Sequence, residues 1–217
     1  MNSQKYKVKP ASGPAKGKAK TGEKVVKKSK SGPAGSSSAK IAPPPAVEPP
    51  KPEGVTCNLK QISKVLLEDS TTKIKESGKW PLLIDSAGNA TTFLRYQDTN
   101  YLCTANSNDM QPETIRRALI GSIRFGKPFV IDMLDTDMYH FLEKNVNDIL
   151  PNLMQDVMNK KVLEEEKYMQ LVKPEDGDLY EINSFDRVHD FLFIIVTKKN
   201  PPPDDLLALM VPVKVEG

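Results

Sequence analysis

The 217-residue chain divides by charge into a basic arm, residues 1–54, and an acidic remainder, residues 55–217. The arm has 12 Lys against 3 Asp or Glu, a net charge of +9; the remainder has 19 Lys or Arg against 25 Asp or Glu, a net of −6. The arm's composition excludes a packed core, whereas 163 residues are enough for one well-filled domain. No apolar run is long enough to span a membrane, and no apolar signal-peptide region opens the chain. We therefore expect a cytoplasmic protein without a transmembrane segment.

The basic arm is predicted to be disordered. Its lysines alternate with small residues, and proline clusters at 43–45 and 49–52 predict a stiff, extended spacer. Two interpretations stay open for it. It is either a solvated tether or a polycation that binds an acidic surface such as microtubules, RNA or anionic lipid. Tyr6 is its one aromatic residue, which argues against recognition of single strands by base stacking.

The first predicted element of the remainder is a helix that starts after Asn58, a suitable N-cap, and ends at Ser77-Gly78. A short apolar strand, Leu82–Ile84, then leads into small, turn-forming residues and an amphipathic stretch that begins at Thr91. Strand, turn and helix in this order are typical of a phosphate loop, in which backbone N–H groups and a helix N-terminus face an anion.

The residues that normally serve a phosphate loop are missing from this one. The ATP-binding pattern is G-x-x-x-x-G-K-[ST], and here Asp85 stands at its first glycine and Thr91 at its lysine. The aspartate would repel phosphate, and threonine cannot supply the missing cation. We interpret the loop as a vestigial nucleotide site that keeps Gly88 and Thr92.

The rest of the chain alternates between predicted strands and helices. This alternation predicts an open, mostly parallel α/β sheet with helices on both faces. Pro212 predicts an edge position for the last strand. The predicted elements are a strand at 101–104, a helix at 111–123, a strand at 129–132, helices in two pieces over 136–168, a surface excursion at 171–183 with a hairpin that ends in Leu179–Ile182, a strand at 191–197, a Pro-rich loop at 200–205 and a strand at 209–215.

The segment Trp80–Ala90, with its Trp-Pro pair, short strand and degenerate loop, resembles the start of the fifth AAA+ module of dynein heavy chains. The similarity continues through Ile123–Ile131, Phe193–Lys199 and Val213–Val215, so that it covers about residues 78–215. The same block also resembles the C-terminal part of IQ-motif and ankyrin-repeat domain-containing proteins, although this chain shows neither an ankyrin repeat nor an IQ helix.

The AAA+ resemblance implies roles for individual residues. Asp132 falls at the magnesium-associated aspartate of the second ATPase motif, Met133 replaces its catalytic glutamate, and Thr197 ends the strand of a polar sensor. Because phosphoryl transfer depends on lysine, magnesium and an orienting carboxylate, we predict no ATPase activity and no resident cofactor. The resemblance also implies a large AAA+ subdomain without a helical lid. Weak ATP or ADP binding at 88–92 is the alternative.

Other chemistry has weaker support in the sequence. Cys57 and Cys103 lack metal-ligand spacing and are expected to be free thiols. His140 and His189 are isolated, and each is expected to be a surface or packed residue. Trp80 is expected to fill the core at the sheet's edge. Asp132, Asp135 and Asp137 lack the glycine and terminal glutamate of a calcium loop, so a metal site there is not expected. Ser86 lacks the G-x-S-x-G elbow, so it is not expected to be a hydrolase nucleophile.

Two functional hypotheses follow. The first is a non-catalytic, dynein-motor-related interaction or scaffold protein with protein partners, in a cytoskeletal or ciliary setting. The second is a weak nucleotide-binding switch that uses a lysine from elsewhere in the chain, such as Lys127.

Overall fold

The computed structural model describes residues 54–66, 68 and 72–216. The chain divides into two units between Val47 and Glu48, and every described residue lies in the second unit. Residues 1–53 of the basic arm lie outside the described residues. The disorder of the arm and its boundary at residue 54 therefore stay predictions. Within the described part of the chain, no helix has the length and apolar character needed to cross a membrane.

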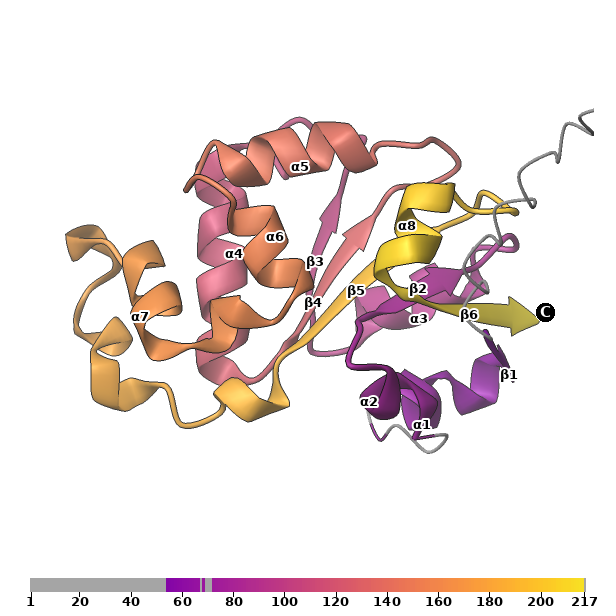
Figure 1. Ribbon diagram of the computed structural model, residues 1–217, viewed down its shortest axis with the longest axis horizontal. Helices are drawn as coiled ribbons and strands as arrows, with labels where there is room; N and C mark the ends of the chain where they lie inside the picture. The colour runs from indigo at the N-terminus through magenta and orange to yellow at the C-terminus, as the bar shows by residue number, and fades with distance from the viewer. Residues whose placement is uncertain (1–53, 67, 69–71, 217) are drawn as a thin grey trace, which may run out of the picture. The chain divides into compact units, whose positions relative to one another are not determined.

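The described domain is built on one sheet of six parallel strands in the order β1-β6-β2-β5-β4-β3 (Figure 1). Parallel neighbours require a crossover between them, and the intervening helices supply it. This architecture confirms the predicted open α/β fold. The strands are β1 (Val55–Asn58), β2 (Pro81–Ile84), β3 (Asn100–Cys103), β4 (Pro128–Asp132), β5 (Leu192–Thr197) and β6 (Val211–Glu216).

Helices cover both faces of the sheet, as predicted. Residues of α4, α5, α6 and α8 belong to the apolar cluster on one face, and residues of α1, α2 and α3 belong to the cluster on the other (Figure 1). The α-helices are α1 (Ile62–Leu66), α2 (Lys73–Ser77), α3 (Asn89–Tyr96), α4 (Pro112–Phe125), α5 (Tyr139–Asn147), α6 (Leu153–Met158), α7 (Glu165–Tyr168) and α8 (Asp204–Leu209).

The two apolar clusters follow from the two-residue period of the strands. Leu82 and Ile84 of β2 point into the cluster under α4, α5, α6 and α8, whereas Leu83 between them points into the other. In β4, Ile131 likewise belongs to the first cluster and Val130 to the second. Strands that are buried on both faces read as continuous apolar runs, which is why these segments could be recognised in the sequence.

The predicted N-terminal helix differs from the structure. Residues Val55–Asn58 form strand β1, which extends the sheet beside β6, and the helical part is divided between α1 and α2. The start and the end were predicted correctly. The Asn58 side chain accepts a hydrogen bond from the Gln61 N–H at 3.1 Å, and Gly78, in the left-handed region at φ 68°, ends α2.

The predicted edge position of the last strand is wrong, because β6 lies between β1 and β2. The pairing of β1 with β6 begins at Val55 and Val213, one residue after Pro212. Pro212 has no backbone N–H to donate. Because it lies at the beginning of that ladder, the missing hydrogen bond disturbs the pairing least. The missed strand β1 is thus the physical reason for the error.

The segment between α7 and β5 is a chain of short 3₁₀ turns, not a hairpin. No ladder pairs any described residue of this segment with another strand, so the possible hairpin at Leu179–Ile182 is wrong. The segment contains η3 (Met169–Leu171), η4 (Pro174–Asp176), η5 (Asp178–Tyr180), η6 (Ile182–Ser184) and η7 (Val188–Asp190). Two further 3₁₀ turns precede it, η1 (Leu59–Gln61) and η2 (Lys161–Leu163).

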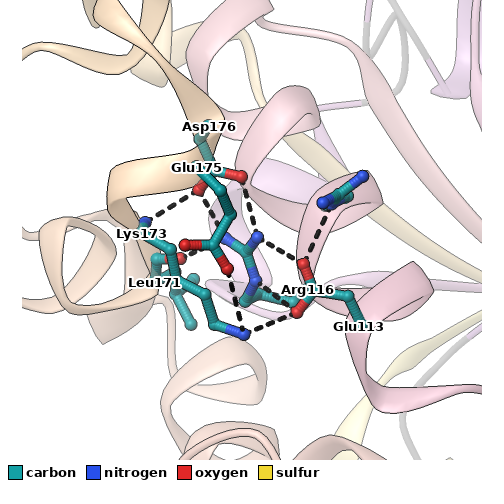
Figure 2. Close-up of polar contacts among 7 residues, drawn as sticks. Glu113, Arg116, Leu171, Lys173, Glu175 and Asp176 are labelled. Atoms are coloured by element: carbon teal, nitrogen blue, oxygen red, sulfur yellow. Dashed lines mark hydrogen bonds and ion pairs between the residues drawn. The ribbon is translucent and has the colours of Figure 1, made fainter.

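A buried arginine holds this segment against α4 (Figure 2). The guanidinium of Arg116 donates to both carboxylate oxygens of Asp176, at 2.7 and 2.8 Å, and to the Leu171 carbonyl. It also forms a bidentate pair with Glu113, at 2.6 and 2.9 Å, and Lys173 reaches the same carboxylate at 2.7 Å. Bidentate pairing of this kind fixes orientation as well as distance, so this segment is anchored although it lacks regular structure.

Trp80 is buried in the core, as predicted, but at the amino end of β2, an interior strand, and not at the edge of the sheet. Its indole Nε1 donates to the Val157 carbonyl at 2.7 Å. Cys57 and Cys103 are both free thiols. Burial raises the pKa of the Cys57 thiol.

Candidate functional site

The carboxyl ends of three neighbouring strands bring the predicted site residues together. Asp85 directly follows β2, Asp132 ends β4 and Thr197 ends β5, and these strands are adjacent in the order β2-β5-β4. All three side chains are fully buried. Ligands of open α/β sheets bind at the carboxyl ends of the strands, so the predicted residues lie where a nucleotide site belongs.

The loop after β2 leads from the carboxyl end of the strand directly into the N-terminus of α3. Gly88 has φ 79°, in the left-handed region that glycine adopts without strain, and directly precedes α3. The N-terminus of α3 faces back toward the end of β2, because the Thr91 N–H donates to the carboxylate of Asp85 at 2.9 Å. The helix therefore presents its donors to a negative charge, and that charge belongs to the chain itself.

The carboxylate of Asp85 accepts hydrogen bonds from two backbone N–H groups at the start of α3 and from one hydroxyl. One oxygen, Oδ1, accepts from the Gly88 N–H at 3.0 Å. The other, Oδ2, accepts from the Thr91 N–H at 2.9 Å and from the Thr91 hydroxyl at 3.2 Å. Asp85 thus acts as a remote cap for α3. The preference of aspartate for helix N-termini could have suggested this role from the sequence.

The two threonines of the loop point in different directions. Thr91, at the position of the phosphate-binding lysine, is buried against Asp85. Thr92, at the position of the magnesium-binding hydroxyl, is exposed, and its hydroxyl donates to the Gly88 carbonyl at 3.1 Å. Neither hydroxyl is therefore directed as a working phosphate loop requires.

Asp132 is held by neighbouring groups of the chain. Its Oδ2 accepts from the Tyr101 hydroxyl at 2.5 Å, and its Oδ1 accepts from the Leu134 N–H at 2.9 Å. The Arg95 guanidinium lies 3.9 Å from the same Oδ2 and 4.7 Å from the centre of the Tyr101 ring. Burial, and then the bond to Asp132, raise the pKa of Tyr101 well above its usual range, so the phenol stays a donor.

The contacts of Tyr101 and Arg95 with Asp132 could not be predicted from the sequence. Tyr101 belongs to β3 and reaches Asp132 because β3 lies beside β4, and Arg95 reaches it from α3. Local patterns do not reveal strand order, so these partners could be found only in the folded chain.

The remaining catalytic positions offer no base. Met133, at the position of the catalytic glutamate, is buried in the apolar core at 1% exposure. The Thr197 hydroxyl accepts from the Lys199 N–H at 3.1 Å and lies 3.4 Å from the Leu134 carbonyl. A thioether cannot polarise water, and the threonine is engaged with the backbone.

The lysine nearest to the loop is not the one expected. Lys127 precedes β4, at the amino end of the sheet, and its Nζ lies 2.6 Å from Asp98 Oδ1. It therefore cannot serve the loop, which follows the carboxyl end of β2. Lys198, directly after β5, lies beside Gly88 instead: a Cβ built on that glycine would be 3.3 Å from its Nζ.

The remaining acidic and histidine residues considered as ligands contact neighbouring groups of the chain. Asp135 accepts from the Thr136 hydroxyl and Asp137 from the Tyr139 N–H, each at 3.3 Å. Within the residues that the structure describes, no group of three or more His, Cys, Asp or Glu side chains is arranged to hold a metal ion. His140 and His189 are exposed and lie 3.4 Å from neighbouring carboxylates. Ser86 is exposed in the loop.

The sequence model of the ATP-binding dynein motor region family matches residues 63–206, from α1 to α8. The chain belongs to this family. The match includes the degenerate loop, Asp132 and Thr197, and thus agrees with the dynein resemblance read from the sequence. No solved structure matches the chain. The likeness to IQ-motif and ankyrin-repeat proteins stays a prediction.

Proposed function

We propose that this dynein-motor-related protein is non-catalytic and acts as an interaction or scaffold module. The observation that carries the proposal is the Asp85 carboxylate on the Gly88 and Thr91 N–H groups. A phosphate would have to displace a buried, hydrogen-bonded carboxylate and then lie next to its charge. Both steps cost free energy, because like charges repel strongly where water is excluded.

The catalytic positions agree with this proposal. Phosphoryl transfer needs a lysine on the phosphates, a magnesium ion and a carboxylate that orients water. Thr91 and Met133 stand at the lysine and carboxylate positions, and Tyr101 already donates to the magnesium-associated Asp132. These substitutions support a loop without hydrolytic activity.

The partners are proposed from the family and from charge. A dynein-motor relative belongs in a cytoplasmic, cytoskeletal or ciliary setting, with protein partners on the α/β domain. The basic arm, with a net charge of +9, would add attraction to an acidic polymer such as microtubules or RNA. Neither part of this role requires a nucleotide.

The test is a thermal shift of the full chain with ATP or ADP and magnesium, combined with calorimetric titration. A ligand at 100 times its Kd stabilises a protein by about 2.7 kcal/mol, so a working site would raise the unfolding temperature clearly. We expect no shift at millimolar nucleotide. A magnesium-dependent shift that saturates would refute the proposal.

A weak nucleotide-binding switch is the second candidate, and Lys198 is the observation in its favour. Its ammonium lies beside Gly88 and could take the part of the missing loop lysine. This hypothesis predicts a nucleotide-dependent shift that Lys198→Gln abolishes and that Lys214→Gln, a change of an exposed side chain of β6, leaves unchanged. If Asp132→Ala and Lys198→Gln both leave nucleotide binding as in the wild type, the switch hypothesis fails.

A further inference from the structure

Apolar side chains are exposed where the 3₁₀ segment meets the end of α4. Leu179 is 64% exposed, Ile182 is 46% exposed, and Phe125 of α4 is 42% exposed. The Arg124 guanidinium connects the two elements, because its carbon Cζ lies 4.2 Å from the centre of the Phe125 ring and 5.3 Å from the centre of the Tyr180 ring. Single exposed apolar residues are common, whereas exposed apolar side chains that gather at one place mark an interaction surface.

The backbone under these side chains is held in place. The Ser184 hydroxyl donates to the carbonyls of Leu179 and Glu181, at 2.8 and 2.6 Å. Phe185, the next residue along the chain, stacks on Tyr168 of α7 with the ring centres 4.5 Å apart. Binding at a surface whose backbone is already ordered costs little conformational entropy, so contacts made there contribute more fully to affinity.

Two carboxylates, those of Asp178 and Glu181, directly precede the two exposed aliphatic side chains of the segment. Both acidic residues are exposed, and within the part of the chain that the structure describes neither carboxylate has an ion pair or a hydrogen bond. The neighbouring cation of α4 is engaged elsewhere, because Arg124 Nε donates to the Ser184 hydroxyl at 3.2 Å. Apolar side chains beside unpaired negative charges fit a partner that supplies positive charges.

The acidic-apolar patch consists of Phe125, Asp178, Leu179, Glu181 and Ile182, and its charge decides which partner it fits. Microtubules, nucleic acids and anionic membranes are negatively charged, so its carboxylates would repel them. A two-fold dimer would place the patch of one copy against the same patch of the other, so that carboxylates would face carboxylates. A protein segment with both apolar and basic side chains complements the whole patch.

We propose that the acidic-apolar patch docks a basic amphipathic segment of another protein. The apolar side chains of that segment would contact Leu179, Ile182 and Phe125, and its lysines or arginines would pair with Asp178 and Glu181. The inference rests on the proposed interaction role and deepens it, because it assigns the surface and the chemistry of the partner.

The test measures the binding of three labelled peptides to the full chain by fluorescence anisotropy. The first is a synthetic amphipathic helix of leucine and lysine. In the second, serine replaces every leucine, and in the third, glutamine replaces every lysine. We expect saturable binding of the first peptide and at least about fivefold weaker binding of the other two, because each lacks one part of the complementarity. Equal binding of all three, or no saturable binding, would overturn the proposal.

Variants locate the contact on the patch. Leu179→Ser should weaken the first peptide about fivefold and Glu181→Gln about threefold, because they remove an apolar contact and a charge at the rim. Leu209→Ser on α8, at 38% exposure, and Glu76→Gln on α2 are the matched controls and should bind as the wild type does. All four side chains are exposed, and equal unfolding temperatures would show that folding is intact. Wild-type affinity in both patch variants would refute this surface.

Sedimentation of the same variants tests a second copy as the occupant. We expect Leu179→Ser to leave the oligomeric state of the full chain unchanged. A dimer that this substitution dissociates would assign the patch to a second copy and overturn the proposal. No residue of the loop after β2 belongs to the patch, so a saturating nucleotide shift with intact peptide binding would refute the non-catalytic role alone.

Discussion

At the scale of single residues, Asp85 fixes the loop after β2 to the start of α3. The same backbone donors serve either a bound phosphate or the carboxylate of the chain, and here the carboxylate holds them. A glycine at this position would leave the donors open, as in a working phosphate loop.

The capping role predicts that Asp85→Ala destabilises the domain. Thr91 would lose the acceptor for its N–H and its hydroxyl in a buried setting, and an unpaired buried donor costs about 1–3 kcal/mol. We expect the free energy of unfolding, measured by urea denaturation, to fall by about 2 kcal/mol. The exposed Asp186 provides the control, and Asp186→Ala should change it by less than about 0.5 kcal/mol. Equal values for the two variants would show that Asp85 does not cap α3.

At the scale of elements, the Arg116 cluster joins α4 to the 3₁₀ segment. Arg116 is 2% exposed and Asp176 is 5% exposed, so Arg116→Met would leave a buried carboxylate without its partner. The expected loss of stability is about 3 kcal/mol. Arg117 contacts the same Glu113 from the surface, at 62% exposure, and Arg117→Met should cost less than about 1 kcal/mol. Urea denaturation of both variants measures the difference, and similar losses would contradict the anchoring role.

The cluster also predicts a dependence on pH. The hydrogen bonds from Arg116 lower the pKa of Asp176 and of Glu113 below their ordinary values of 3.8 and 4.5. As pH falls below about 4.5, the unfolded chain takes up protons before the folded one, so this stabilisation is present above that pH and is lost on acidification. The stability difference between the wild type and Arg116→Met should therefore shrink from pH 6 toward pH 3. A constant difference over that range would mean that the carboxylates do not depend on Arg116.

Helices and strands could be predicted where a local pattern of residues specifies them. Leu82–Ile84 and Phe193–Val196 are continuous apolar runs, so their burial on both faces of a parallel sheet could be foreseen. Strand β1 could not, because Val55 and Cys57 are two isolated apolar residues whose role depends on pairing with β6 at the other end of the chain. The same limit hid the partners of Asp132.

At the scale of the whole molecule, the charge division is the dominant feature. The opposite net charges of +9 on residues 1–54 and −6 on residues 55–217 assign attraction to acidic polymers to the arm alone. The remainder would be repelled by the same polymers. Deletion of residues 1–54 should therefore abolish binding to microtubules or RNA.

Salt and a variant of reduced charge make this last prediction specific. Binding through exposed lysines falls steeply as salt rises, because the screening length is about 10 Å at 0.1 M salt. Co-sedimentation with microtubules at low and high salt should show binding by the full chain only at low salt. A variant with Lys24, Lys27, Lys28 and Lys30 changed to Gln keeps the length of the arm but lowers its net charge to +5, and should bind weakly. If the deletion binds as the full chain does, the acidic domain makes the contact itself, and the arm is a tether.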